Sequence, residues 1–344
     1  MSGMATKSPI VTLTPAPTLD RTYTVTDLVS GAVNRADAVG EELAGKGINV
    51  ARALHLAGIP APAVVPIGNA EKGILERTGS KNFLVPLWID GTIRVSTTIL
   101  ERGGTTTKIN EAPKPLSSNE WQQVIELTEK TVIENEAKWL VIAGALPLDE
   151  STGTFVDLHP IFERMEKLGV RVVLDTSGEP LAYWVRQGEA AILKPNAEEL
   201  ASAVGRDLLT NGDVIEAARE LCSHGVECVL ASLGSDGMLA VTKSRAWATR
   251  TAPVKVINTV GAGDATLAGF LAAITNNPIA EGEQDFGVEF NVPVGAMAAV
   301  QWGAVKVSQP TSGLDHIDNL PEVFLTEDVD LAAPLKEPAI HKEN

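Results

Sequence analysis

The sequence predicts an α/β protein, with a doubly wound, mostly parallel sheet and a smaller separate β-sheet. From Lys138 onward, short apolar runs alternate with amphipathic stretches, which is the pattern of parallel strands joined by crossover helices. The first third instead carries candidate strands that have polar residues on at least one face and no helix between the members of each pair. The length of 344 residues, 44% apolar and 21% charged, is typical of a globular chain and excludes disorder as the main state.

The larger sheet and its helices are expected within one domain that spans residues 9–319. Strands are predicted at 138–143, 170–175, 190–193 and 226–232, followed by an alternating pair at 237–242 and 245–251. Helices are predicted at 155–168, 213–223, 265–274 and 292–307. The last helix contains a weakly charged run that is too short and too rich in Gly and Gln for a membrane span, so we expect it to be buried.

The smaller sheet is expected from two segments, at about 21–40 and 90–111. Its strands are predicted at 21–28, 32–38, 92–100 and 105–110, and Glu101-Arg102-Gly103-Gly104 has the composition of a hairpin turn. A sheet inserted in this way can serve as a lid over the larger body. Residues 1–8 and 320–344 are expected to be loose tails, because the second is acidic, contains three prolines and shows little periodicity.

Charge and cysteine content narrow the classes of function. Asp and Glu number 44 against 28 Lys and Arg, and the net charge of −16 disfavours binding to nucleic acid or to an anionic membrane. The two cysteines cannot form a disulfide framework, and no charged segment followed by an apolar run opens the chain. We therefore expect a cytoplasmic protein.

The strongest local signal is a glycine-rich turn before an apolar helix, Gly261-Ala262-Gly263-Asp264. Backbone N–H groups at a helix N-terminus stabilise negative charge, as on a phosphoryl group in transfer. Asp264 beside them is a candidate catalytic base, although Asp also serves as an ordinary helix cap. The segment is neither a Walker loop nor a complete dinucleotide fingerprint, because its third glycine is missing.

Three further segments carry polar groups at places where helices or turns begin. Gly45-Lys46-Gly47 with Asn49 precedes an amphipathic helix and can bind a phosphate or sugar hydroxyls, or can be a glycine turn with a solvated lysine. Asn196 and Glu199, after Lys194, have the spacing of a capping box, and the functional alternative places a carboxylate near magnesium-bound phosphates. Ser232 and Gly234 lie in a segment between two strands that ordinarily forms a tight turn.

The four segments, in the order in which they occur along the chain, resemble the phosphofructokinase B family of ribokinase-like carbohydrate kinases. The resemblance extends over about residues 11–314. Within that family the chain is most similar to the bacterial 1-phosphofructokinases, through Thr12-Leu13-Thr14-Pro15, Thr107-Lys108-Ile109-Asn110-Glu111 and Leu174-Asp175-Thr176-Ser177-Gly178. The resemblance implies ATP and Mg²⁺ as cofactors and a homodimer that pairs through the lid.

The resemblance also implies a role for each site residue. Asp264 would be the general base, and Gly261, Ala262 and Gly263 would form the anion hole. In the implied sugar-phosphate site, Asp20 and Asn49 hold the hydroxyls, and Lys46 and Arg94 hold the phosphate already on the sugar. Gly45 and Lys108 complete this substrate site. The implied nucleotide site comprises Lys194, Asn196, Glu199, Ser232 and Gly234, with Glu199 near the metal.

The reaction expected from the resemblance is the ATP-dependent conversion of fructose 1-phosphate to fructose 1,6-bisphosphate. Kinases for tagatose 6-phosphate or fructose 6-phosphate are alternatives, because Ala16, Ala44, Ala143 and Ala145 depart from the usual family residues around the sugar. A kinase for an unphosphorylated sugar or nucleoside is disfavoured by Arg94 together with Lys46. A non-catalytic sugar-binding regulator is disfavoured by Asp264, and a dehydrogenase by the incomplete dinucleotide fingerprint.

Overall fold

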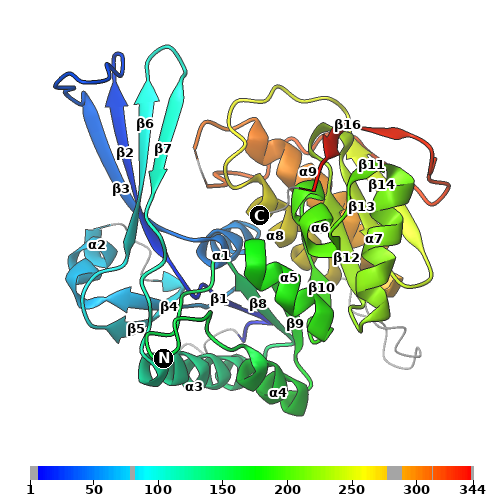
Figure 1. Cartoon of the computed structure of the whole chain (residues 1–344), viewed down its shortest axis with the longest axis horizontal. Coiled ribbons are helices and arrows are strands. Elements are labelled where there is room, and N and C mark those ends of the chain that lie inside the picture. Colours follow the sequence, from blue (N-terminus) through cyan, green and yellow to red (C-terminus); the bar gives the residue numbers. More distant parts are fainter. Residues whose placement is uncertain (1–6, 78–81, 277–288, 312, 342–344) are drawn as a thin grey trace.

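A twisted sheet forms the centre of the molecule in the computed structural model, which describes residues 7–77, 82–276, 289–311 and 313–341 (Figure 1). Within these residues the sheet has ten strands, of which the first seven in spatial order are parallel and the last three antiparallel. The order is β5 (Leu84–Ile89), β4 (Ala63–Gly68), β1 (Ile10–Leu13), β8 (Trp139–Ala143), β9 (Arg171–Asp175), β10 (Ile192–Leu193), β12 (Cys228–Ser232), β13 (Met238–Val241), β14 (Ala246–Thr251) and β15 (Val323–Thr326).

Helices cover both faces of this sheet, which confirms the doubly wound prediction. One apolar core lies under α3 (Ser118–Asn135), α4 (His159–Leu168), α5 (Gly178–Gln187), α6 (Ala197–Val204) and α7 (Asn211–Ser223). The other lies under α1 (Lys46–Leu56), α2 (Lys72–Arg77), α8 (Ala262–Asn276) and α9 (Val292–Val307). Parallel strands require such cover because both of their faces are apolar. Short 3₁₀ turns are η1 (Asn69–Glu71), η3 (Gly234–Asp236) and η4 (Glu289–Asn291).

The smaller sheet stands apart from the body and is called the lid sheet below (Figure 1). Its order is β3 (Ala38–Ala44), β2 (Thr18–Val25), β6 (Arg94–Glu101) and β7 (Thr106–Asn110). The hairpin turn between β6 and β7 is confirmed, because the N–H of Glu101 donates to the carbonyl of Thr105 at 2.9 Å. The strand predicted at 32–38 is wrong. Asn34 bonds both backbone groups of Val29 within its own loop, so pairing with β2 begins only at Asp37 and Ala38.

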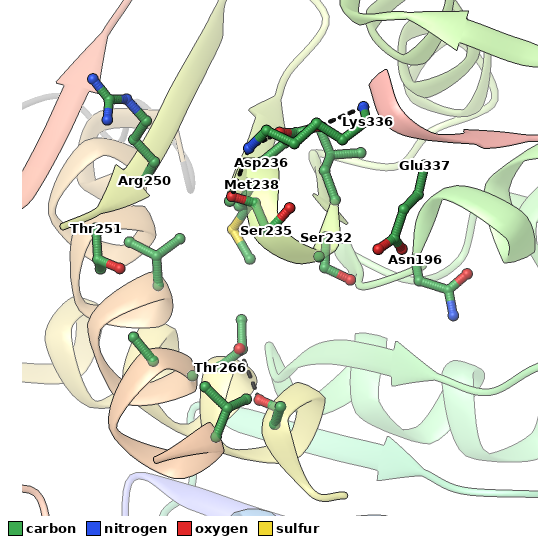
Figure 2. Close-up of a pocket in the computed structure, with 18 of the residues that line it drawn as sticks. Asn196, Ser232, Ser235, Asp236, Met238, Arg250, Thr251, Thr266, Lys336 and Glu337 are labelled. Carbon is green, nitrogen blue, oxygen red and sulfur yellow. Dashed lines mark hydrogen bonds and ion pairs between the residues drawn. The ribbon is translucent and has the colours of Figure 1, made fainter. Parts of the chain in front are cut away.

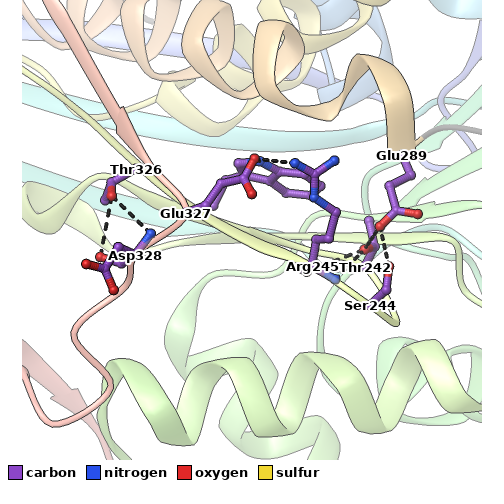
Figure 3. A network of polar contacts seen from close by, with 8 residues as sticks. Thr242, Ser244, Arg245, Glu289, Thr326, Glu327 and Asp328 are labelled. Atoms are coloured by element: carbon purple, nitrogen blue, oxygen red, sulfur yellow. Dashed lines mark hydrogen bonds and ion pairs between the residues drawn. The ribbon is translucent and has the colours of Figure 1, made fainter.

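The prediction of a loose acidic tail at 320–344 is also wrong for the residues described. β15 extends the main sheet beside β14, and β16 (Pro334–Ala339) pairs with β11 (Leu208–Thr210). Glu327, directly after β15, accepts a hydrogen bond from the buried indole of Trp247 at 2.7 Å and pairs with Arg245 (Figure 3). The partners that stabilise Glu327 in this position come from a distant part of the sequence. The composition of residues 320–344 alone therefore did not indicate a strand.

The expected N-terminal tail divides at the limit of the described residues. Residues 1–6 lie outside them, so that part of the prediction is not addressed. Ser8 is fully buried, and its hydroxyl donates to the carbonyl of Ile10 at 2.7 Å and to that of Pro60. The chain is therefore anchored just before β1.

Candidate active site

The residues of the candidate site in the body gather where the parallel strands end. Asp175 is the last residue of β9, Lys194 directly follows β10, and Gly144 directly follows β8. The carboxyl ends of parallel strands share one edge of a sheet, and in open α/β sheets ligands bind in the crevice at that edge. The N-termini of α1 and α8 reach the same place, so residues far apart in sequence meet there.

Asp264 lies in the first turn of α8 and is only 7% exposed. The side-chain amide of Asn49, on α1, donates to its Oδ2 at 2.8 Å. Burial, with the negative charge of Asp175 adding to it, raises the pKa of Asp264 to about 6. A carboxylate with this pKa is mostly ionised at neutral pH and is a better proton acceptor than an ordinary Asp.

Asp175 is buried between two lysines at the centre of the site. Its Oδ1 lies 2.9 Å from Nζ of Lys46, and its Oδ2 lies 3.3 Å from Nζ of Lys194. Burial opposes its charge, but Lys194 and Lys46 hold the pKa of Asp175 below its usual value. For Lys46 burial again opposes the charge, and Asp175, Glu199 and Asp264 together raise its pKa. The Lys46 ammonium group is therefore charged beside Asp264.

The glycines of the 261–264 turn have a structural reason. Gly261 has φ of +79°, which disfavours residues with a side chain. A Cβ on Gly263 would lie 3.1 Å from Nζ of Lys194, so glycine brings that ammonium close to the helix N-terminus. The N–H of Ala262 already donates to the carbonyl of Thr259 at 3.2 Å. The first-turn N–H groups of Gly263 and Asp264 have no carbonyl one turn earlier in the helix, so they remain available as donors at its N-terminus.

Asn258 and Lys306 hold the segment that precedes the glycine turn. The side-chain amide of Asn258 donates to the carbonyls of Pro310 and Thr311 at 3.0 and 3.1 Å, and its Oδ1 accepts from Val260. Lys306, on α9, is fully buried with Nζ 3.4 Å from the carbonyl of Asn258, and burial lowers its pKa. Sequence analysis assigned no role to Lys306, since a lysine near a helix C-terminus is usually solvated.

The turn at Gly45 positions Lys46 and Asn49. Gly45 has φ of +149°, and a Cβ there would lie 2.5 Å from Cγ2 of Thr14. Gly47 meets the same side chain, because its Cβ would lie 2.5 Å from Oγ1 of Thr14. That hydroxyl accepts the N–H of Ile48 at 3.0 Å and so caps α1. The two glycines allow α1 to begin against β1, with Lys46 and Asn49 turned toward α8.

The predicted lid residues share one face of the lid sheet. Asp20 pairs with Glu42 on β3 and with Ser96 on β6, in the same alternation that contains Arg94 and Lys108. Burial and the charge of Glu42 raise the pKa of Asp20 to about 6, while Arg94 and Lys108 act in the opposite direction. Nη2 of Arg94 donates to the carbonyl of Ala16 at 3.1 Å, and its buried Nε has no hydrogen-bond partner among the described residues.

A cavity of about 980 Å³ opens beside the turn and is called the side cavity below (Figure 2). Asn196, Ser232 and Gly234 line the cavity, and so do Ala262 and Gly263 of the glycine turn. Val256, Val300 and Val307 provide an apolar wall. This combination of an apolar wall and a few polar groups suits a small ligand with a flat apolar part.

The structure confirms the capping box predicted for Asn196 and Glu199. Oδ1 of Asn196 accepts the N–H of Glu199 at 2.7 Å, and Oε2 of Glu199 accepts the N–H of Asn196 at 2.9 Å. Among the described residues, His, Cys, Asp and Glu form no group of three or more that could hold a metal ion. In the same part of the chain, no helix is both long and apolar enough to cross a membrane.

The sites predicted from sequence thus separate into three parts. Lys46, Asn49, Lys194 and Asp264 surround Asp175; Asn196, Ser232, Gly234, Ala262 and Gly263 line the side cavity; and Asp20, Arg94 and Lys108 lie on the lid sheet. Asp175 itself was not proposed as a site residue. A carboxylate at the end of a buried strand was the available signal, because that position opens on the ligand-binding edge.

These features define a phosphotransferase of ribokinase-like α/β fold, with a glycine turn, a buried carboxylate and two lysines at its centre. Residues 15–289 match the pfkB family of carbohydrate kinases, and the chain belongs to that family. It is 34% identical over 272 residues to the 1-phosphofructokinase of Haloferax volcanii, covering 77% of this chain and 83% of that protein. It is 32% identical over 294 residues to the ATP-dependent 6-phosphofructokinase isozyme 2 of Escherichia coli, covering 81% and 90%.

Solved structures agree with the assignment. The crystal structure of phosphofructokinase-2 from Escherichia coli in complex with potassium matches with a TM-score of 0.77 and 28% identity. The match covers 90% of this chain and 96% of that chain. The chain is accordingly a carbohydrate kinase with the α/β fold and separate small sheet predicted from its sequence.

Proposed function

We propose that this kinase transfers the γ-phosphoryl group of ATP to fructose 1-phosphate and forms fructose 1,6-bisphosphate. The observation that carries the proposal is the buried Asp264, held by Asn49 at 2.8 Å beside the Lys46–Asp175–Lys194 ion pairs. The relative from Haloferax volcanii named 1-phosphofructokinase supports the choice of substrate. Regulation without turnover would have no need of a buried carboxylate with a raised pKa.

In the proposed mechanism, the oxygen of the sugar hydroxyl bonds to the γ-phosphorus of ATP while Asp264 accepts the proton of that hydroxyl. The bond between that phosphorus and the oxygen of ADP breaks, and the N–H groups at the α8 N-terminus stabilise the charge on the transferring group. Lys46 and Lys194 add positive charge at the same place. The enzyme's contribution is mainly positioning and electrostatics, as phosphoryl transfer requires.

The lid face is the proposed site for the phosphate already on the sugar. Arg94 supplies a planar fork that suits a phosphate dianion, and Lys108 adds a charge two strands away from Asp20. Asp20 and Asn49 are proposed to bind sugar hydroxyls, with Gly45 allowing close approach. The resemblance also assigns Lys46 to this phosphate. Because Lys46 pairs with Asp175, we propose instead that its charge acts on the transferring phosphoryl group, and that Arg94 is the principal ligand for the sugar's own phosphate.

Mg²⁺ is proposed to accompany ATP, bound mainly by the phosphates. Such a site needs only one or two carboxylates from the protein, which fits the absence of a three-residue cluster among the described residues. Glu199 is the residue proposed to lie nearest, because it is close enough to Lys46 to raise its pKa. Bound Mg²⁺ would supply charge neutralisation on the phosphates.

The lid sheet is proposed to pair with a second copy of the chain. Its face opposite Asp20 carries Tyr23, Val39, Ile99 and Ile109, and Val39 and Ile109 are 57% and 60% exposed. Apolar side chains exposed on a sheet are typical of an interface. Sedimentation or light scattering of the parent beside Ile109→Asp tests this proposal. A parent of monomer mass would contradict the homodimer, and a variant that stays dimeric would contradict pairing through this face.

Steady-state kinetics across a panel of sugars tests the proposed substrate. Fructose 1-phosphate is expected to give a higher kcat/KM than fructose 6-phosphate, tagatose 6-phosphate or free fructose, with ATP and Mg²⁺ present. Fructose 6-phosphate is the second candidate, because a relative that is 32% identical is named 6-phosphofructokinase. A preference for any other member of the panel would refute the choice of sugar and leave the family assignment unchanged.

A further inference from the structure

The C-terminal strand β16 forms part of the wall of the side cavity. Leu335, Lys336, Glu337 and Pro338 all line it, although they lie well beyond the end of the segment that matches the family at 15–289. Leu335 and Ala339 are buried at 5% and 1% exposure, whereas Glu337 between them is exposed. β16 therefore anchors in the core on both sides of a carboxylate that faces the cavity.

Two contacts to Asp236 hold β16 in this position. The N–H of Lys336 donates to Oδ2 of Asp236 at 2.8 Å, and Nζ of Lys336 lies 2.7 Å from Oδ1. Asp236 belongs to η3, the short turn that begins at the predicted nucleotide-site residue Gly234. The contacts join the C-terminal segment to the loop that lines the cavity, so the neighbouring Glu337 is presented at a defined place.

The Glu337 carboxylate stands on the same side of the cavity as Ser232 and Asn196 (Figure 2). Its Oε2 lies 3.5 Å from the position that a Cβ on Gly234 would occupy, so the glycine leaves the space in front of it open. Among the described residues Glu337 has no ion pair or hydrogen bond through its carboxylate. An exposed acceptor in a cavity wall is available to a ligand.

A carboxylate only accepts hydrogen bonds and repels phosphate, which limits what it can recognise. The phosphate end of the cavity is at Ala262 and Gly263, beside Lys194, and the apolar wall of Val256, Val300 and Val307 suits a flat base. The remaining donors of a nucleoside triphosphate between these two ends are the ribose hydroxyls. We propose that Glu337 is a specificity-determining residue that accepts hydrogen bonds from the ribose hydroxyls of the nucleotide. The inference rests on the proposed use of ATP.

The test compares ATP with 2′-deoxy-ATP and 3′-deoxy-ATP in the parent, Glu337→Ala and Glu337→Gln. Glu322→Gln is the matched control, because Glu322 lies in the same C-terminal segment, is exposed and does not line the cavity. In the parent, kcat/KM for at least one deoxynucleotide should be about tenfold below that for ATP. Glu337→Ala should raise the KM for ATP by about tenfold, change kcat less than about twofold, and make the three nucleotides nearly equal.

Calorimetric titration with the same three nucleotides separates this inference from the proposed function. Ribose discrimination in binding that Glu337→Ala abolishes would support the inference even if no sugar in the panel were phosphorylated, and the lack of turnover would refute only the proposed function. Turnover by a parent that treats the three nucleotides alike would refute the role of Glu337 and leave the proposed function standing. Discrimination among the three nucleotides that persists in Glu337→Ala would also refute the role of Glu337.

Discussion

Replacement of Asp264 by Asn separates a catalytic base from a helix cap. Asn and Asp cap helices equally well, and the new side chain could still accept the hydrogen bond from Asn49 through its amide oxygen. The negative charge and the ability to accept a proton are lost. We therefore expect kcat to fall by at least about 100-fold, the usual effect of losing a general base, with the affinity for the sugar phosphate retained.

The difference in stability between the parent and this variant depends on pH, because only the parent has the titrating carboxyl group of Asp264. The pKa of Asp264 is raised from 3.8 to about 6, so the folded protein holds this proton more tightly than the unfolded chain. Stability is therefore lost as the pH rises from about 4 to about 6, and at about 1.4 kcal/mol per pKa unit the loss approaches about 3 kcal/mol above that range. Asn carries no charge, so the variant should be more stable than the parent at pH 8, with the difference shrinking below pH 6.

Urea unfolding at pH 4.5, 6 and 8, with turnover and sugar-phosphate titration at pH 8, checks both expectations. Near-normal turnover would refute the role of Asp264 as base. A variant that loses turnover and is also less stable than the parent at pH 8 would show that the carboxylate is needed for folding, which would refute the reasoning from its burial. Lost turnover with equal or greater stability is the expected result.

Three further changes test other parts of the site. Arg94→Ala should raise the KM for the sugar phosphate about tenfold or more and leave the KM for ATP unchanged, whereas Arg21→Ala, on the opposite face of the lid sheet, should change neither; the reverse split would refute the assignment. Asp175→Asn should lower the free energy of unfolding by about 3 to 5 kcal/mol, measured by urea titration, because it leaves buried ammonium charge unpaired; a loss below about 1 kcal/mol would contradict this. In a pH–rate profile, kcat/KM should fall at least about tenfold per unit below pH 6, since Asp264 and Asp20 both protonate there, and a flat profile to pH 5 would contradict it.

The sequence by itself determined the class of fold and the segments that carry chemistry. The apolar helix predicted at 292–307 coincides with α9, because a weakly charged, apolar run of that length is typical of a largely buried helix. The glycine turn before Asp264 was also evident, because a backbone conformation with positive φ limits the residue type. The helix α3 was not predicted, although its capping box at Ser117 and Glu120 was present in the sequence.

Only the tertiary structure decided which of these segments meet. Asp175 becomes the centre of the site because β8, β9 and β10 are neighbours, which places two lysines from distant segments on one carboxylate. The strand β3 begins at Ala38 because its pairing with β2 competes with a local loop, and local composition does not decide that competition. The acidic residues of the C-terminal segment are predicted to be solvated until their partners are known. The contact of Glu327 with Trp247 and that of Lys336 with Asp236 join residues 80 and 100 positions apart, which no local pattern encodes.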